Sequence, residues 1–406
     1  MAARPSGSSA PRIQLLDFIR FMAMVLMVEG HTLEAFLRPQ DIRMADFGWN
    51  AWVGLRGLTA PLFLMVSGAA SVLGVRHEAD GRVARELIRR RVRMGLSLTG
   101  LGYLMVMPAN RLADLAYVTP TLWRASLQVS ILQLNGVTLL LLTALLARVR
   151  SVRRYAAWSL GLGVGILAAA PLVQRMAWFR WLPEPLGAFL SVDHGSLFPL
   201  FPTSAYMFLG VALGAVLKET PEARRLPAFR AACLGAAALA FLLAWVGYGL
   251  PALPGAGLPW NPADPVFTLM RLGAALLAFA ALAWAAGALP RAAAAGARLG
   301  RHSLAVYLGH LVLLYGTPWT RGLADLQAHQ LPLAQALPFV PLLWAACFGG
   351  VLLFQGLKAR WSPALTTLQV LGAFALAYLL VYGLQRGPAR MASLQPALVL
   401  PVPRAP

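Results

Sequence analysis

The feature that most constrains this chain is a series of long apolar segments separated by short polar loops. A helix needs about 20 mostly apolar residues to cross a bilayer. Because 59% of the residues are apolar and only 12% are charged, the chain has too few polar side chains to cover soluble domains. The sequence therefore predicts an all-α polytopic membrane protein with about eleven transmembrane helices, or ten if the last segment lies in the interface. The predicted spans are at about 14–36, 50–75, 94–108, 127–147, 155–173, 196–217, 231–250, 265–288, 303–318, 335–357 and 364–384.

The basic residues are unevenly divided between the two sets of loops. The chain has 35 Lys and Arg against 15 Asp and Glu, a net charge of +20. Of the basic residues, 22 fall on the set of loops that includes the N-terminus and 10 on the other set. Because cytoplasmic loops are enriched in Lys and Arg, we expect the N-terminus in the cytoplasm, in a bacterial inner (plasma) membrane. This distribution also argues against nucleic acid as a partner. The remaining three lie inside predicted spans: Arg20, Arg56 and Arg271.

One transmembrane domain is expected over residues 13–384, with a disordered cytoplasmic tail at 1–12 and a C-terminal tail at 385–406. The first apolar run contains Asp17 and Arg20 and lacks a small-residue cleavage pattern, so it is not predicted to be a cleavable signal. The sequence has no HExxH, no paired His/Cys cluster, no glycine-rich nucleotide loop and no GxSxG. We therefore expect no metal and no permanently bound cofactor.

The first predicted span carries a polar stripe. At about 100° per residue, Asp17, Arg20, Met24 and His31 fall within roughly 60° of one another on a helix. Arg20 and His31 are eleven residues apart, roughly 16 Å along the axis. Polar groups at this depth usually face an interior or an aqueous cavity, which indicates a conduit or an active site. The alternative is a structural Asp17–Arg20 pair with His31 at the interface.

The densest basic cluster precedes the third span. Arg89 and Arg93 are four residues apart and share a helix face that suits bidentate binding of phosphate groups. On spacing alone, anchoring of the cytoplasmic side or contact with anionic lipid is the stronger interpretation.

Other polar groups collect toward the outer ends of the predicted spans. Asp193 follows the fifth span, and Glu34 lies one turn beyond His31. His310 shares a helix face with Ser303 and Tyr307, and either a structural or a catalytic role stays open for it. The second span contains Pro61, which can kink a helix, and a small-residue face at 67–71 that favours close helix packing.

Several of these residues resemble a known superfamily. Arg20, ten intervening residues and His31 resemble the opening of membrane-bound acyltransferases, and Arg89 and Arg93 match that superfamily's pair of arginines separated by three residues. Further segments resemble the heparan-α-glucosaminide N-acetyltransferase family and its bacterial members, in order along the chain. They are PLFLMVSG (61–68), VSILQLNGV (129–137), LFPLFPTSAYMFLGVALG (197–214), PVFTLMRLG (265–273) and GRHSLAVYLGH (300–310).

The resemblance implies an enzyme that takes an acyl group, usually acetyl, from cytoplasmic acyl-CoA as co-substrate. It implies transfer to a hydroxyl or amine of an extracytoplasmic glycan or glycolipid. His31 would be the catalytic histidine, as general base or acyl carrier, with Arg89 and Arg93 on the CoA and Arg20 supporting the conduit. Glu34 or Asp193 could orient His31, and His310 is a second candidate for catalysis. A transporter or flippase of a sugar- or lipid-linked substrate is the alternative, followed by a scaffold or sensor; a homodimer is not excluded.

Overall fold

The computed structural model describes residues 14–43, 45–78, 80–249, 264–360 and 362–383, so the predicted tails at 1–12 and 385–406 lie outside the described residues. Regular structure in this part of the chain is almost entirely helical, which confirms the predicted all-α class. The long helices are α1 (Gln14–Phe36), α2 (Phe47–Gly57), α3 (Thr59–Leu73), α4 (Arg85–Met105), α6 (Ile131–Leu146), α7 (Val152–Arg175), α10 (Ala205–Glu219), α11 (Glu222–Gly249), α12 (Pro265–Ala288), α13 (Pro290–Gly300), α14 (Ser303–Tyr315), α17 (Phe339–Arg360) and α18 (Ser362–Tyr382).

Short elements connect them, mostly at one end of the bundle. A hairpin pairs Gly316 with Arg321 and Thr317 with Thr320 in antiparallel register. The short elements are η1 (Pro39–Asp41), η2 (Leu112–Tyr117), α5 (Pro120–Leu127), η3 (Trp178–Arg180), α8 (Glu184–Gly187), α9 (Leu200–Thr203), β1 (Gly316–Thr317), β2 (Thr320–Arg321), α15 (Ala324–Gln327) and α16 (Leu333–Ala336).

Ten of the eleven predicted spans each coincide with one of the long helices, and the second, at 50–75, covers both α2 and α3. By length and apolar composition, six helical stretches in the described residues are able to cross a membrane, and α5 with α6, bent by 57°, makes a seventh if counted as one span. The other segments have more charge or less apolar length: α1 and α4 are rich in charged residues, and α14 is short. The chain is therefore an integral membrane protein, while the exact number of spans and the side of the N-terminus stay predictions.

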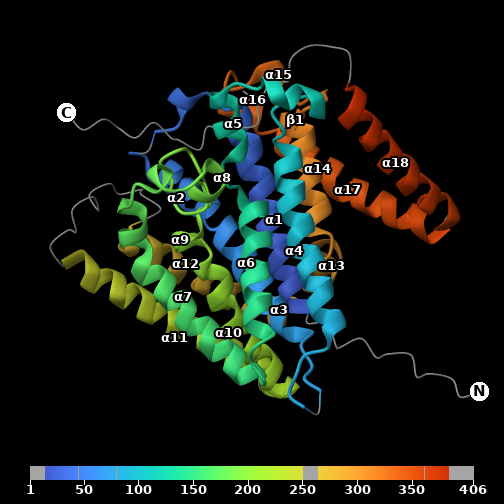
Figure 1. The fold of residues 1–406 in the computed structure, drawn as a ribbon. Coiled ribbons are helices and arrows are strands. Elements are labelled where there is room, and N and C mark those ends of the chain that lie inside the picture. Colours follow the sequence, from blue (N-terminus) through green and yellow to red (C-terminus); the bar gives the residue numbers. More distant parts are fainter. Residues whose placement is uncertain (1–13, 44, 79, 250–263, 361, 384–406) are drawn as a thin grey trace, which may run out of the picture.

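The first helix lies inside the bundle. It packs against α3, α12, α13, α14 and α17, while α10 packs against α3, α7 and α11, and α4 packs against α6 (Figure 1). Buried apolar side chains form one large core around α3, α6, α7, α10, α11 and α12. A second core joins the C-terminal half of α1 to α14 and α17. The residues that the first span contributes are thus held from several sides.

Small residues bring α3 and α10 into backbone contact. A Cβ at Gly68 would lie 1.9 Å from the carbonyl oxygen of Met207, and one at Gly210 would lie 2.2 Å from that of Met65. No larger residue fits at either position without moving a helix. The interpretation of the small-residue face at 67–71 as a packing surface is therefore confirmed.

The second predicted span is interrupted close to Pro61. The helix α2 ends at Gly57 and α3 begins at Thr59. Proline has no N–H, so the carbonyl four residues earlier, that of Gly57, has no partner from Pro61. Arg271 of α12 donates a hydrogen bond from Nη2 to this carbonyl. An arginine from a distant helix therefore stabilises the break.

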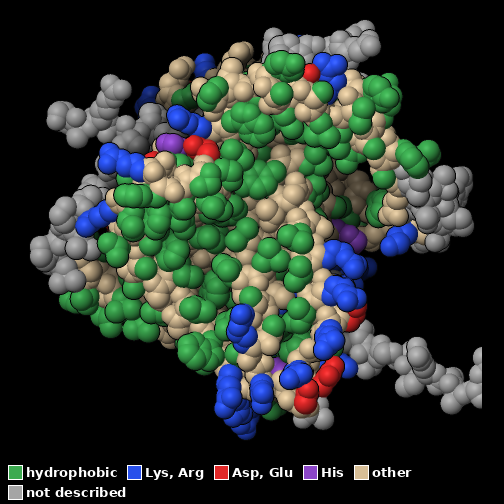
Figure 2. Space-filling model, viewed as in Figure 1, with side chains coloured by type: hydrophobic (Ala, Val, Ile, Leu, Met, Phe, Trp, Pro, Cys, Tyr) green, Lys and Arg blue, Asp and Glu red, His purple; other side chains and the backbone are tan. Residues whose placement is uncertain are grey.

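Basic side chains gather at the end of the bundle where α3 joins α4, α6 joins α7 and α10 joins α11 (Figures 1 and 2). Two of them bind the carbonyls at the end of α3: Arg91 donates to Ser71, and Lys218 donates to Val72 and Val75. Cations are stabilised at a helix C-terminus, where the carbonyl dipoles are unpaired. Some of the basic side chains at this end of the bundle thus stabilise the end of α3, whether or not a ligand binds.

Candidate active site

Two histidines from distant parts of the chain meet between α1 and α14. His31 Nδ1 lies 2.9 Å from His310 Nε2, and His310 Nδ1 lies 3.1 Å from the carbonyl oxygen of Val306. A carbonyl oxygen only accepts, so His310 carries its proton on Nδ1. In a neutral ring His310 Nε2 then accepts, and His31 donates to it from Nδ1. The contact leaves Nε2 of His31 unprotonated, which is the form that a general base or a nucleophile needs.

The two rings differ in exposure. His310 is completely buried, whereas His31 is only partly buried. Tyr315, at the end of α14, donates a hydrogen bond of 3.4 Å to the His31 carbonyl oxygen, and the Tyr307 ring meets the His310 ring edge-on at 5.5 Å. The buried ring of His310 is therefore fixed by its surroundings, and the partly buried ring of His31 stays accessible to a reacting group.

An ion pair lies beside His31. Arg56 Nη2 lies 3.3 Å from Glu34 Oε1, and both side chains are largely buried. A Cβ at Gly30 would lie 2.6 Å from Arg56 Cγ, so the absence of a side chain at Gly30 provides the path for the arginine. Glu34 Oε2 is buried and has no hydrogen-bond partner in the described part of the chain. Sequence reasoning identified Arg56 as a charge within a span but did not find its partner.

A second polar contact lies on the same turn of α1. Trp52 of α2 donates a hydrogen bond of 2.7 Å from Nε1 to Glu29 Oε1, and the Arg56 guanidinium lies 5.2 Å from the centre of the Trp52 ring. Two carboxylates of α1 therefore meet an arginine and an indole of α2 in the C-terminal part of α1, close to His31.

The polar stripe of α1 is not continuous in the structure. Arg20 Nη1 lies 2.6 Å from Asp17 Oδ1, and Asp17 Oδ2 lies 3.6 Å from Arg301 Nε, so the predicted Asp17–Arg20 pair is present. Between Arg20 and His31, Met24 and Met27 are buried against the second core. This face of α1 is packed with thioether side chains, and the conduit that the stripe predicted stays a prediction.

The predicted donor arginines lie on α4. Arg89 and Arg93 are exposed and share one face, whereas Arg91 between them is buried and binds the Ser71 carbonyl. The two exposed side chains are thus available to a ligand, and the structural one faces the bundle. Binding of CoA by Arg89 and Arg93 stays a prediction.

The predicted orienter Asp193 lies in the loop between α8 and α9. Its N–H bonds to Ser191 Oγ at 3.1 Å, and the neighbouring His194 bonds to Glu184 at 2.6 Å and stacks on Phe179. In the described residues Asp193 makes no hydrogen bond to His31, whose Nδ1 is taken by His310. An orienting role for Asp193 therefore stays a prediction, and no contact with His31 in the described residues supports it.

No group of three or more His, Cys, Asp or Glu side chains able to hold a metal ion occurs in the residues that the structure describes. The two cysteines, Cys233 and Cys347, are buried and unpaired. Close to His31 the structure brings together imidazole, carboxylate and guanidinium groups.

The fold and site define a helical membrane protein with a histidine pair inside the bundle. The chain matches the acyltransferase domain family over residues 13–355 and belongs to that family. Among curated proteins, none matches it. The chain is accordingly a membrane acyltransferase, which confirms the superfamily that Arg20, His31, Arg89 and Arg93 resemble. The likeness to the heparan-α-glucosaminide N-acetyltransferase family stays a prediction.

Proposed function

We propose that this chain transfers an acyl group, usually acetyl, from cytoplasmic acyl-CoA to a carbohydrate hydroxyl or amine on the outer side. The observation that carries the proposal is the hydrogen-bonded series from Val306 through His310 to His31. That series fixes the tautomer of His31 and leaves Nε2 as its basic nitrogen. Membership of the acyltransferase domain family supports the reaction class.

In the transfer step, an acceptor oxygen or nitrogen forms a bond to the thioester carbonyl carbon while His31 Nε2 takes its proton. The tetrahedral intermediate then breaks its C–S bond, and the proton passes from Nε2 to the departing CoA sulfur. The products are the acylated acceptor and the CoA thiol, and His31 returns to its neutral form. His310 keeps its own proton on Nδ1 throughout and holds the His31 ring in place.

A second route uses the same nitrogen. His31 Nε2 attacks the thioester carbonyl carbon, the C–S bond breaks, and CoA leaves as a thiolate that takes a proton from water, while the acyl-imidazolium keeps its Nδ1 proton, hydrogen-bonded to His310. The acceptor then forms its bond to the acyl carbon, the bond from that carbon to Nε2 breaks, and the acceptor gives its proton to water. The route differs in that donor and acceptor need not be bound together. Arg56 of α2 lies against Gly30, the residue before His31, and its charge would stabilise a developing oxyanion in either route.

The donor would bind by its phosphates to Arg89 and Arg93, with Arg20 between that end and His31. Arginine suits phosphate because its planar guanidinium donates two parallel hydrogen bonds. The separation of Arg20 and His31, roughly 16 Å along α1, must be crossed by the pantetheine arm. Met24 and Met27 are unbranched and flexible side chains that can repack around such an arm.

The experiment uses the purified full chain in nanodiscs. Binding of CoA is measured first, and then transfer of labelled acetyl from acetyl-CoA to a panel of soluble glycans and glycolipids. His31→Ala is expected to abolish transfer while CoA still binds, and His302→Ala is the matched histidine control that should keep it. Wild-type transfer rates in His31→Ala contradict the role of His31. Sugar counterflow without acyl transfer supports the transporter alternative instead.

A further inference from the structure

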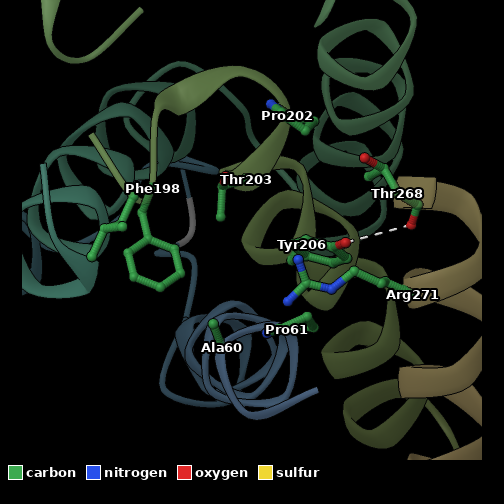
Figure 3. Close-up of a pocket in the computed structure, with 9 residues that line it drawn as sticks. Ala60, Pro61, Phe198, Pro202, Thr203, Tyr206, Thr268 and Arg271 are labelled. Atoms are coloured by element: carbon green, nitrogen blue, oxygen red, sulfur yellow. Dashed lines mark hydrogen bonds between the residues drawn. The ribbon is translucent and has the colours of Figure 1, made fainter. Parts of the chain in front are cut away.

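A small cavity lies beside the break between α2 and α3 and is not used in the proposed chemistry. It has a volume of about 30 Å³ and is lined by residues of α3, α9, α10 and α12 and of the loop before α9, among them Pro61, Phe198, Thr203, Tyr206, Thr268 and Arg271 (Figure 3). A cavity needs about 10–15 Å³ in this measure to hold one water molecule. The space therefore fits roughly two waters, or a group of similar size such as a carboxylate or the oxygens of a phosphate.

The charged group in this cavity is Arg271. Its guanidinium points between Tyr206 and Pro61 (Figure 3), donates from Nη2 to the Gly57 carbonyl and lies 5.3 Å from the Phe267 ring centre. Within the described ranges no carboxylate forms an ion pair with it. A guanidinium has five N–H donors, and the bond to Gly57 uses one. Positive charge and donors are thus left over at the cavity.

The neighbouring polar groups do not neutralise this charge. Tyr206 uses its hydroxyl to donate to the Thr268 carbonyl at 3.4 Å, and the Thr203 hydroxyl lines the cavity as a neutral group. An uncompensated arginine within a transmembrane bundle costs several kcal/mol and usually marks a ligand site. The chemistry that completes this cavity is an anion.

The cavity is joined to the candidate active site through the chain itself. Arg271 donates to the carbonyl of Gly57. The preceding residue, Arg56, packs its side chain against Gly30, next to His31 in α1. We infer that the acceptor is an anionic carbohydrate. Its carboxylate or phosphate binds Arg271 in this cavity, while the hydroxyl or amine that receives the acyl group lies at His31. This inference rests on the proposed function for the acylation, but the binding of the anion does not depend on it.

The test compares matched sugars on the full chain in phosphatidylcholine nanodiscs. Glucuronic acid and glucose 6-phosphate carry the anion, and glucose is the neutral partner; binding is measured by the ligand-dependent rise in the unfolding temperature. We expect the wild type to prefer the anionic sugars and Arg271→Gln to weaken their binding at least tenfold. Arg180→Gln, which removes an exposed charge from the same end, should keep the preference. Arg271→Lys, which keeps a cation, should retain part of it even if the glutamine variant folds poorly.

Three results overturn the inference. One is equal binding of glucose and the anionic sugars by the wild type. Another is anion affinity in Arg271→Gln and Arg271→Lys that stays within twofold of the wild type. The third is complete loss of sugar binding when phosphatidylglycerol is added to the nanodiscs, because the cavity then belongs to a lipid headgroup.

Acetyl-CoA measurements on the same variants separate this inference from the proposed function. CoA affinity should be unchanged by Arg271→Gln, since Arg89 and Arg93 lie at the other end of the bundle. If the wild type transfers no acetyl group yet binds glucuronic acid through Arg271, the proposed function fails and the anion site stands. If transfer proceeds equally to neutral and anionic sugars, the proposed function stands and the anion site fails.

Discussion

His31 Nδ1 lies 2.9 Å from His310 Nε2, although 279 positions separate the two residues in the sequence. The contact joins the first helix of the bundle to α14 and gives the more exposed imidazole a buried partner. In many hydrolases and transferases a base is oriented by a third group, and in the proposed mechanism a second histidine, itself bonded to the Val306 carbonyl, would take that place.

Replacing His310 by Phe is expected to lower the turnover number by about 100-fold or more, the usual contribution of a positioned acid–base group. The phenylalanine fills the buried space but cannot accept the proton of His31 Nδ1, so His31 is free to change tautomer. CoA affinity should stay unchanged. The measurement is labelled acetyl transfer at saturating acetyl-CoA, together with CoA binding.

Two further variants make this result specific. His310→Gln keeps an acceptor and should retain more activity than His310→Phe. Tyr307→Phe removes only a hydroxyl from the ring that meets His310 edge-on, and it should behave like the wild type. Equal activity in His310→Phe and Tyr307→Phe would show that the contact with His31 does not matter for turnover.

The sequence predicted the long helices well because apolar length alone determines where a helix can lie in a bilayer. The segment predicted at 14–36 and α1 (Gln14–Phe36) coincide, and the small residues at 67–71 pack as expected. The sequence alone could not predict which helices are neighbours, because helical periodicity shows which residues share a face of one helix but not which other helix packs against that face. The pairing of His31 with His310 is therefore visible only in the structure.

The same limit applies to the polar stripe and to the charges inside the spans. Periodicity places Arg20 and His31 on one face, but whether that face is open depends on helices far along the chain, and Met24 is buried there. The helix break next to Pro61 was predictable, since a proline removes the hydrogen bond to the Gly57 carbonyl. That Arg271 supplies the hydrogen-bond donor to the Gly57 carbonyl could not be predicted.

Replacing Arg56 by Met should destabilise the fold by about 3–5 kcal/mol, the usual cost of leaving a buried charge unpaired. The side chains of Arg56 and Glu34 are only 13% and 9% exposed, so solvent screens them little. The double variant Arg56→Met, Glu34→Gln removes both charges and should recover a large part of that loss. Chemical unfolding in detergent measures the difference, and a double variant no more stable than Arg56→Met would contradict a direct pairing.

Alanine in place of Gly68 should lower the unfolding temperature, because its Cβ would meet the Met207 carbonyl at 1.9 Å and force α3 and α10 apart. The matched control is Gly100→Ala in α4, where a Cβ meets nothing within 4 Å. An alanine stabilises a helix interior by roughly 1 kcal/mol relative to glycine, so this control should be neutral or stabilising. Similar thermal shifts in the two variants would falsify the packing argument.

The arginines of α4 allow donor binding to be separated from helix packing. Arg89 and Arg93 are exposed on one face, Arg90 is exposed on another, and Arg91 is buried against the Ser71 carbonyl. We expect the double variant Arg89→Ala, Arg93→Ala to bind CoA about tenfold more weakly, on the order of 1.4 kcal/mol, with an unchanged unfolding temperature. Arg91→Met should lower the unfolding temperature and leave CoA affinity unchanged, since it removes a cation from the end of α3.

Arg90→Ala decides whether the effect is local. It removes the same charge from the same helix turn but from a different face, so general attraction of the anionic donor to this end of the bundle would make it weaken CoA binding as much as Arg89→Ala. A specific phosphate site would leave its CoA affinity close to that of the wild type. Titration of CoA at low and high salt completes the measurement, because general attraction between exposed charges falls with ionic strength. Equal losses in Arg90→Ala and Arg89→Ala that disappear in high salt would mean that the arginine pair serves only to anchor this end of the bundle at the membrane surface.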